Sequence, residues 1–366
     1  MPQRFFLYLI LKGQLPCSEN AQMFDETNFQ LIDNGKALGQ TVDTPTNLQP
    51  RALSMPDLTG DSDYLSDLSE KDKPWDNHRA NADTVQNLYR SAKYDRYADR
   101  IYSCSTLLEY VMNSNDEGDV AFRLQSAHFC RVRYCPVCQW RRSLKWQAKM
   151  FEAMPKIQEQ YPTHKWLFLT LTVRNCDLVE LRTTVQDMNK AFKRLSQLKS
   201  FPAIGWVKSV EVTRNPQTDQ AHPHFHCLML VESKYFGGRN YIKQEEWRSL
   251  WQRCLRANYL PIVNVKAVKP KANNDISNAI VETFKYSVKE SDLVADAGWL
   301  VQLTNQLHQT RAIAIGGVLK DFLKEEKEND DLIHVDEDNL EPQIDEGIKA
   351  FFGWREAVKR YKKIDW

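Results

Sequence analysis

Hydrophobic and polar residues alternate in a regular order over the second half of the chain. Short runs rich in β-branched and aromatic residues predict strands, at 166–173, 204–214, 222–231 and 261–268. Longer amphipathic stretches predict helices, at 178–198, 245–259 and 276–289. The turn-rich sequence NPQTDQ joins the second and third strands into a hairpin. This order favours an α+β fold, with an antiparallel sheet and helices on one face, over a doubly wound parallel sheet.

The pattern is weaker before this region. Residues 16–82 are rich in Asn, Asp, Ser, Thr and Pro and lack a sustained apolar period. We therefore expect residues 1–95 to form a largely disordered or variable arm. The remaining segments are expected in this order: a small cysteine-bearing module with its connecting helix at 96–155, the sheet domain at 156–323, an acidic linker at 324–346 and a short basic segment at 347–366.

The formal net charge of +1 hides an uneven distribution of charged residues. Residues 96–324 carry 33 Lys and Arg against 21 Asp and Glu, whereas residues 1–95 carry 9 against 14. Residues 325–346 carry 11 acidic residues and one basic residue. A basic centre between acidic ends is typical of a polyanion-binding core, although an ordinary solvated surface gives similar counts.

The cysteine content and the lengths of the apolar runs indicate in which cellular compartment the protein is found. No apolar run approaches the ~20 residues that a membrane-spanning helix needs, and FFLYLIL at 5–11 lacks a small-residue cleavage site. Eight cysteines in a chain of 366 residues do not make a disulfide scaffold. We therefore expect a soluble, cytoplasmic protein without a membrane partner.

Three cysteines crowd into the sequence CRVRYCPVC, namely Cys130, Cys135 and Cys138, and Cys104 lies upstream. Four thiolates are a typical ligand set for structural Zn²⁺, and the CPVC turn supplies two of them. His128 is the alternative to Cys104 as the first ligand. A redox CxxC pair is the competing interpretation, which the third cysteine and the basic sequence WRRSLKW disfavour.

The sequence HPHFH places His224 and His226 two residues apart on a predicted strand. Alternate side chains on a strand share a face, so both imidazoles can bind one ion. If Thr213 pairs with His222 across the hairpin, Glu211 lies opposite His224 and supplies a carboxylate. Two nitrogens and a carboxylate suit Mn²⁺ or Mg²⁺. His222 is the alternative third ligand, or a substrate contact.

The predicted helix at 276–289 has an apolar face that repeats every fourth residue and a polar face with Glu282, Lys285, Tyr286 and Lys289. Glu282 and Tyr286 are then one turn apart. A phenol with a pKa of ~10 is a poor nucleophile unless cations stabilise the phenolate, and Lys285 or Lys289 could do so. An exposed tyrosine on such a helix usually has no chemical role, so this hypothesis depends on the metal site.

Four motifs in order resemble the rolling-circle replication initiators of small bacterial plasmids, which belong to the HUH endonuclease superfamily. These motifs are CRVRYCPVCQWRR (130–142), FLTLT (168–172), HPHFH (222–226) and KYSVK (285–289). The resemblance covers roughly residues 100–320. It implies a ferredoxin- or RRM-like sheet domain for the nuclease, preceded by a zinc-binding module.

The resemblance also implies residue roles. Tyr286 would cut one strand at the double-strand origin, stay joined to the 5′ phosphate and free a 3′ hydroxyl. Glu282 matches a glutamate that activates water for the final cleavage, and Lys289 matches a lysine beyond the tyrosine. His224 and His226 match the metal-binding pair. The expected DNA contacts come from Tyr286, Lys285, Arg141, Arg142 and His222.

The expected partner is origin DNA, cut as an exposed single strand, with a host helicase and polymerase. Two other kinds of enzyme use the same chemistry and are the alternatives. A conjugative relaxase usually carries a larger histidine cluster, and a single-strand transposase of this type lacks the four-cysteine module. A non-catalytic zinc-containing DNA-binding regulator would leave HPHFH and Tyr286 without a purpose.

Overall fold

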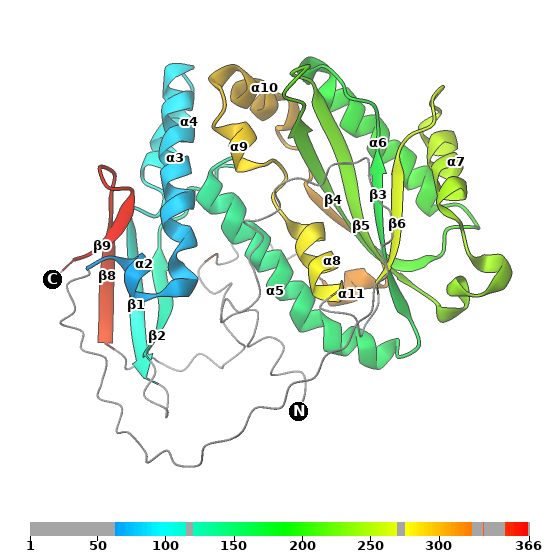
Figure 1. The fold of residues 1–366 in the computed structure, drawn as a ribbon, viewed down its shortest axis with the longest axis horizontal. Helices are drawn as coiled ribbons and strands as arrows, with labels where there is room; N and C mark the ends of the chain where they lie inside the picture. The colour runs from blue at the N-terminus through cyan, green and yellow to red at the C-terminus, as the bar shows by residue number, and fades with distance from the viewer. Residues whose placement is uncertain (1–62, 115–119, 269–274, 324–331, 333–347, 365–366) are drawn as a thin grey trace, which may run out of the picture.

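Two antiparallel sheets organise the chain (Figure 1). The computed structural model describes residues 63–114, 120–268, 275–323, 332 and 348–364. The larger sheet has the order β6-β3-β5-β4-β7 and the smaller has the order β2-β1-β8-β9. The strands of the larger sheet are β3 (Lys165–Thr172), β4 (Ala203–Arg214), β5 (Ala221–Val231), β6 (Val263–Val268) and β7 (Ile313–Gly317). Every neighbouring pair is antiparallel, which confirms the predicted α+β class.

Helices cover both faces of the larger sheet. On one face, α6 (Leu181–Ser196) and α7 (Gln244–Leu255) pack against inward side chains such as Leu169 and Phe225. On the other face, α5 (Pro136–Gln160), α8 (Asp275–Phe284) and α11 (Leu319–Phe322) pack against Leu228 and Leu230. The prediction had helices on one face of the sheet, and the structure has helices on both. The reason is that the second half of β5 carries apolar side chains on both faces.

The short elements complete this unit. They are η2 (Leu178–Glu180), η3 (Ser233–Phe236), η4 (Gly238–Asn240), α9 (Glu290–Leu293) and α10 (Ala297–Leu307).

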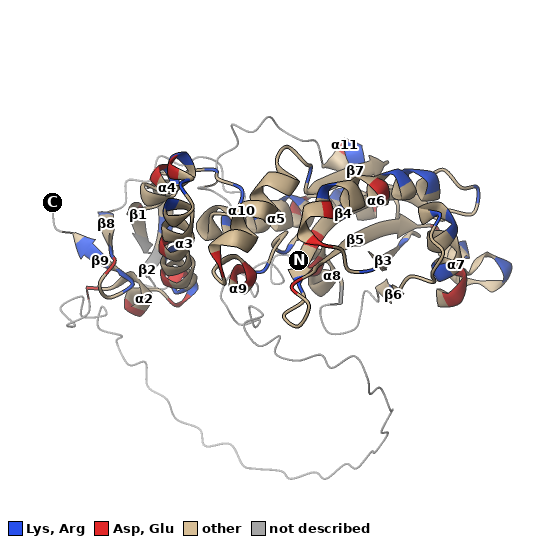
Figure 2. Ribbon diagram, turned by 90° about the horizontal axis from the view of Figure 1, so that it is seen from above, with Lys and Arg blue, Asp and Glu red and all other residues tan. Residues whose placement is uncertain are grey.

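No helix in the described part of the chain combines the length and the apolar character that crossing a membrane requires. Lysines and arginines lie along α6 and around α7, with acidic residues among those of α7 (Figure 2).

The smaller sheet joins the two ends of the described chain. It contains β1 (Leu107–Ser114), β2 (Val120–Ala127), β8 (Ile348–Arg355) and β9 (Arg360–Ile364), and β8 lies between β1 and β9. The helices beside it are α2 (Leu65–Leu68), η1 (Glu70–Asp72), α3 (Pro74–Ser91) and α4 (Asp95–Tyr102). The expected basic C-terminal segment is therefore part of the same module as the N-terminal helices.

The expectation of a disordered arm up to residue 95 is wrong for residues 65–91, which form packed helices. Residues 1–62 of that arm, and all of the expected linker at 324–346 except Leu332, lie outside the described residues. The expected boundary at 155 is also absent, because α5 starts in the cysteine module and continues onto the sheet.

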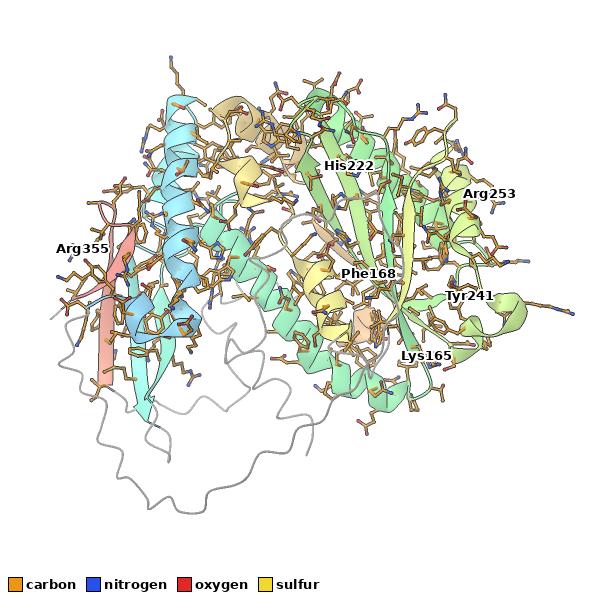
Figure 3. All side chains as sticks on the ribbon, in the orientation of Figure 1. Lys165, Phe168, His222, Tyr241, Arg253 and Arg355 are labelled. Carbon is orange, nitrogen blue, oxygen red and sulfur yellow. The ribbon has the colours of Figure 1, made fainter. Side chains whose placement is uncertain are left out.

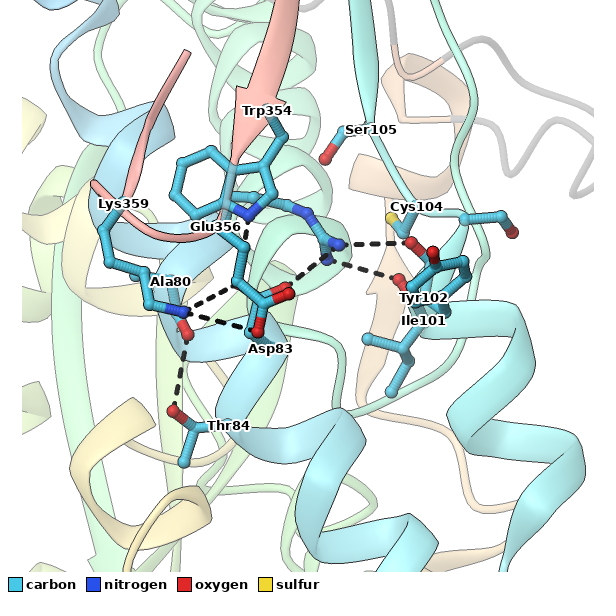
Figure 4. A network of polar contacts seen from close by, with 12 residues as sticks. Ala80, Asp83, Thr84, Ile101, Tyr102, Cys104, Ser105, Trp354, Glu356 and Lys359 are labelled. Atoms are coloured by element: carbon cyan, nitrogen blue, oxygen red, sulfur yellow. Dashed lines mark hydrogen bonds and ion pairs between the residues drawn. The ribbon is translucent and has the colours of Figure 1, made fainter.

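Buried polar residues on α3 explain why its apolar period is weak. Arg79 donates to the carbonyl oxygens of Ile101 and Tyr102 at 3.2 and 3.1 Å and pairs with Asp83 at 3.0 Å. Asp83 also accepts hydrogen bonds from Trp354 and Lys359, at 2.9 and 3.0 Å. This network ties α3 to the end of α4 and to the β8–β9 hairpin (Figure 4).

Candidate active site

A carboxylate and two imidazoles converge on the β4–β5 hairpin. The strand register pairs Glu211 with His224 and Thr213 with His222, as predicted. Glu211 Oε2 lies 3.0 Å from His224 Nε2 and 2.8 Å from His226 Nε2. Glu211 is only 3% exposed, and one ligand atom from each of the three side chains lies within 4.8 Å of the others. We call these three residues the Glu-His-His cluster.

The other ring nitrogen of each imidazole has its own partner. His224 Nδ1 lies 3.3 Å from the carbonyl oxygen of His222, and His226 Nδ1 lies 3.4 Å from Thr170 Oγ1. The ring of Phe168 stacks on that of His226, with centroids 5.6 Å apart. Figure 3 labels Phe168 and His222 at different heights of the sheet. In the register of β3 and β5, His224 and His226 lie between His222 and Leu228, which pairs with Phe168. Such contacts fix the orientation of metal-binding imidazoles.

Charge compensation keeps the buried carboxylate ionised. Burial alone would raise the pKa of Glu211, but hydrogen bonds with His224 and His226 and the charge of Lys285 outweigh it and hold this pKa well below its usual range. Burial lowers the pKa of His226, which favours the neutral imidazole that binds metals. Lys285 Nζ lies 2.9 Å from Glu211 Oε2 and 2.5 Å from Glu282 Oε1.

The Glu-His-His cluster has a donor set that fits one divalent cation. Two imidazole nitrogens and one carboxylate oxygen form a mixed set with room for further ligands. His222 is not part of this cluster, because its Nδ1 is hydrogen-bonded to Asn175 Oδ1 at 2.8 Å. Its ring centroid is nevertheless only 5.4 Å from that of His224. The geometry thus favours Glu211 over His222 as the third ligand.

The predicted helix at 276–289 is too long, because α8 ends at Phe284. β7 pairs only with residues 205–209 of β4, so the next part of β4 is open to another segment. The carbonyl oxygen of Ser287 accepts a 2.9 Å hydrogen bond from Val212 N, and Val288 forms a parallel bridge with Val212. Ser143 Oγ also donates to the carbonyl oxygen of Phe284, at 2.6 Å. These tertiary bonds end the helix although its apolar period continues.

This change of conformation separates the residues of the KYSVK motif. Lys285 points to Glu211, whereas the half-buried ring of Tyr286 packs edge-on against His78, with centroids 6.0 Å apart. Glu282 and Tyr286 are therefore not neighbours on one helix face as expected. Glu282 Oε1 lies 3.6 Å from His226 Nε2, beside the cluster. Lys289 is exposed and precedes α9 as its N-cap residue.

Four buried cysteines form the second candidate metal site. The Sγ atoms of Cys104 and Cys138 are 3.7 Å apart, those of Cys130 and Cys138 are 3.6 Å apart, and those of Cys104 and Cys135 are 3.7 Å apart. A tetrahedral zinc site with Zn–S bonds of ~2.3 Å has sulfur–sulfur edges of about 3.8 Å. The structure therefore brings Cys104 to the other three, whereas His128 is exposed and outside the group.

Backbone amides point at these sulfur atoms, as in a metal knuckle. The amide of Cys130 donates to Cys104 Sγ at 3.4 Å, and that of Arg131 donates to Cys138 Sγ at 3.3 Å. Hydrogen bonds from the three other cysteines lower the pKa of Cys138, whereas burial raises that of Cys135. Such amide donors stabilise thiolate ligands.

Two predicted DNA contacts have structural partners. Arg141 is 0% exposed, donates to the carbonyl oxygen of Leu332 at 2.9 Å and lies over the rings of Trp75 and Trp140. This arrangement does not support the expected phosphate contact, because the guanidinium is buried and engaged within the protein. Arg142 donates to the carbonyl oxygens of Val132 and Arg133, at 3.2 and 3.4 Å, and so braces the loop between the cysteines.

The N-terminal helix α3 contributes a residue that the sequence did not reveal. His78 Nδ1 donates to Glu290 Oε1 at 2.6 Å, and its ring stacks on Trp140 with centroids 4.6 Å apart. Since Tyr286 packs on the same imidazole, α3 forms one wall around the candidate nucleophile. A single histidine in the polar sequence DNHRANAD gives no motif that would identify it.

Comparison with known proteins gives one consistent result. A family model described as "Replication protein" matches residues 121–362. "Protein rep" of Streptococcus pneumoniae serotype 2 (strain D39 / NCTC 7466) is 32% identical over 301 residues, covering 80% of this chain and 92% of that protein. "Protein rep" of Lactiplantibacillus plantarum is 36% identical over 249 residues, covering 63% and 78%. "Replication protein" of Staphylococcus aureus is 35% identical over 218 residues, covering 56% and 93%. No solved structure matches the chain.

Proposed function

Since the chain belongs to the "Replication protein" family of plasmid replication proteins, we propose that it nicks one DNA strand at the double-strand origin and starts rolling-circle replication. The cut strand would be held through a covalent 5′-phosphotyrosine, and the freed 3′ hydroxyl would prime synthesis. The observation that carries this proposal is the buried Glu-His-His cluster, which lies beside the segment that contains Tyr286.

Tyr286 is the proposed nucleophile. Its backbone runs beside β4, because Ser287 bonds to Val212, the residue after Glu211. Lys285 brings a positive charge to the same place, 2.9 Å from Glu211 Oε2. The Tyr286 ring packs on His78, so in this arrangement Lys285 pairs with Glu211 and Glu282 and not with the phenol.

The Glu-His-His cluster is the proposed catalytic metal site. When bound there, Mn²⁺ or Mg²⁺ would supply a Lewis acid for the phosphate that is attacked. The protein's own contribution is to hold Glu211 ionised and His226 neutral in a buried setting. The four-cysteine cluster is proposed to hold structural Zn²⁺.

Glu282 is proposed to activate water for the final cleavage, which would release the enzyme. Its carboxylate is partly exposed and lies 3.6 Å from His226 Nε2, so water can reach a group beside the metal site. Lys289 is exposed, and we propose that it contacts phosphate of the bound strand. His222 and Arg142 are further proposed DNA contacts.

The proposed partners are origin DNA, cut as an exposed single strand, and a host helicase and polymerase. A phosphotyrosine ester keeps the free energy of the broken DNA bond, so rejoining needs no nucleotide hydrolysis. The sequence contains no GxxxxGK phosphate loop, which agrees with such a transesterification.

The experiment is incubation of the purified full-length chain with Mn²⁺ and supercoiled DNA that carries a cognate origin. We expect relaxed product and a protein–DNA adduct from the wild type, and neither from Tyr286→Phe. Tyr241→Phe is the matched control, because Tyr241 is an exposed tyrosine on the far side of the sheet domain (Figure 3). An adduct formed by Tyr286→Phe would refute the assigned nucleophile.

A further inference from the structure

A cavity of about 210 Å³ lies next to the four-cysteine cluster. It opens where the loop between Cys130 and Cys135 meets α4 and the end of α10, and the side chains that matter are Tyr97, Arg100, Arg131, Arg133, Tyr134 and His308. Three arginines and no carboxylate line it, so its field favours an anion. The volume is below the ~300–1,000 Å³ of sites for drug-sized ligands, so a single small unit fits.

Existing hydrogen bonds orient two of these arginines. Arg133 donates from Nη1 to the carbonyl oxygens of Leu307 and Thr310, at 2.8 and 2.7 Å. Arg100 donates from Nη2 to the carbonyl oxygen of Cys130. Because a guanidinium has five N–H groups, each arginine keeps donors that these bonds do not use. The loop and α10 thus hold the cations in place before any ligand arrives.

The hydroxyl of Tyr134 is the most informative atom of the cavity. Tyr134 is 1% exposed, and the hydrogen of its hydroxyl has no acceptor among the described residues, since the neighbouring Arg133 can only donate to the phenol oxygen. Burial raises its pKa to about 12, with Arg133 acting in the opposite direction, so it is a neutral donor at physiological pH. Buried hydroxyls in native proteins nearly always have partners, so an orphaned one in a cavity wall indicates a missing ligand.

Aromatic rings complete the lining. Tyr97 stacks on Tyr89 with centroids 5.3 Å apart, and Tyr89 is fixed by a 2.7 Å hydrogen bond with Thr304. Bases stack on such rings, while exposed arginines such as Arg100 and Arg131 pair with phosphate. The cavity therefore offers an aromatic ring for a base and guanidinium groups for a phosphate.

We propose that this cavity binds one nucleotide of single-stranded DNA, with its phosphate at Arg100 and Arg131 and its base against Tyr97 and the Tyr134 hydroxyl. The choice of DNA as ligand rests on the proposed function. The site would anchor the strand at the cysteine module, apart from the cluster on β4 and β5. It gives the cysteine loop a binding role as well as a structural one.

Tyr134→Phe tests the base contact, because it removes only the orphaned hydroxyl. The readout is affinity of the full chain for a short single-stranded origin oligonucleotide, measured by fluorescence anisotropy at fixed salt. We expect the affinity to fall about five- to tenfold, which corresponds to the loss of one hydrogen bond. The midpoint temperature of thermal unfolding should stay the same or rise. Unchanged affinity would overturn the proposal.

Paired charge variants test the phosphate contact. Arg100→Gln with Arg131→Gln should weaken oligonucleotide binding about tenfold or more. The control, Arg239→Gln with Arg253→Gln, removes the same charge from exposed residues of η4 and α7 and should change the affinity less than about twofold. Equal losses would show unspecific attraction and refute the site. If these variants bind normally while wild type still forms the Tyr286 adduct, the cavity proposal fails and the proposed function stands.

A second, independent observation concerns His78. Both carboxylate oxygens of Glu290 are engaged, Oε1 by His78 Nδ1 at 2.6 Å and Oε2 by Asn81 Nδ2 at 2.7 Å. Nδ1 then carries the hydrogen, and Nε2 keeps its lone pair. Trp140 stacks on one face of the ring, and Tyr286 packs at its edge. Glu290 contacts His78 through this hydrogen bond, and Tyr286 contacts it through its ring.

The geometry points to His78 as the base that accepts the Tyr286 proton, an assignment that rests on the proposed function. The phenol O–H bond breaks and its proton goes to His78 Nε2 while the phenol oxygen forms a bond to phosphorus. The bond from phosphorus to the 3′ oxygen breaks with its electron pair, and that oxygen takes a proton from water. Glu290 stabilises the imidazolium, as a carboxylate does beside a catalytic histidine.

The test measures the rate of adduct formation against pH. His78→Ala should slow it about 100-fold and abolish the acidic limb of the profile, and added imidazole should restore part of the rate. His128→Ala is the control, since His128 is exposed and outside both clusters. Glu290→Gln, which preserves the shape of the pair, should also slow adduct formation, but less than His78→Ala does, because the imidazole keeps a hydrogen-bond partner. An unchanged profile in both variants would overturn the assignment, while adduct formation by wild type leaves the proposed function intact.

Discussion

Glu211 on β4 lies directly opposite His224 on β5, and its Oε2 is 3.0 Å from His224 Nε2. The cross-strand pair is completed by His226, at 2.8 Å from the same oxygen. These three buried groups could hold one divalent cation, and Lys285 lies 2.9 Å from the carboxylate oxygen that they share. The first prediction follows from this geometry.

Glu211→Gln should weaken Mn²⁺ binding by ~100-fold, because it replaces the anionic ligand with a neutral amide. Isothermal titration calorimetry of the metal-free protein measures the change. His222→Gln is the control, because His222 is bonded to Asn175 and lies outside the cluster, and it should bind Mn²⁺ as the wild type does. If His222→Gln loses the ion and Glu211→Gln keeps it, the third ligand is His222.

Cys135→Ser should remove zinc from the chain and lower its stability. The thiolate supplies one of four ligands, and a serine hydroxyl does not replace it. Metal content by mass spectrometry of the purified protein should fall from about one zinc per chain to nearly none. Cys254→Ser, at a buried but isolated thiol, should retain the metal. Equal zinc in both variants would rule out the four-cysteine site.

Asp83→Asn should destabilise the protein by about 3 kcal/mol, because it leaves the buried guanidinium of Arg79 without its counter-charge. Urea unfolding at neutral pH measures the difference. Asp95→Asn removes an ion pair with Arg90 that is exposed to solvent, and should change stability far less. Similar values for the two variants would contradict the role of the network that joins α3 to β8 and β9.

Lys208→Met should stabilise the protein at neutral pH. Lys208 is 4% exposed, and burial lowers its pKa from 10.5 to about 8. At ~1.4 kcal/mol per pKa unit, the penalty is about 3 kcal/mol, partly offset by its contacts with Asn189 and the Phe225 ring.

The sign of the pH dependence follows from proton binding. Between pH 8 and 10.5 the unfolded chain binds the Lys208 proton more tightly than the folded chain, so wild-type stability gains with rising pH through this group. The advantage of Lys208→Met should therefore shrink across this window. Denaturant unfolding of both proteins at several pH values provides the comparison, and a constant difference would argue against a buried charge.

The sequence predicts the hairpin and the register of its candidate metal ligands well because both depend on local pairing. A strand period of two and a turn-rich loop determine which residues face each other, and the register of Glu211 with His224 follows. The cysteine cluster is similarly readable, since three ligands lie within one short loop. Only the choice between Cys104 and His128 needed the three-dimensional structure.

Features that depend on distant segments could not be predicted. The apolar period from Ile276 to Val288 is helical, yet the chain leaves the helix at Phe284 because the open part of β4 offers a backbone bond at Val212. The helix α3 is hidden in a polar sequence, because its inward positions include Arg79 and Asp83, which pair with each other and bond to residues of α4, β8 and the β8–β9 turn. In both places, tertiary bonds outweigh local periodicity.

The most direct test is identification of the residue that becomes linked to DNA. Wild-type protein is incubated with Mn²⁺ and a radiolabelled single-stranded origin oligonucleotide, digested with protease, and the labelled peptide is sequenced by mass spectrometry. The account predicts a nucleotide on Tyr286 and on no other tyrosine. A label on Tyr241 or Tyr259, or no covalent adduct on any cognate origin, would contradict it.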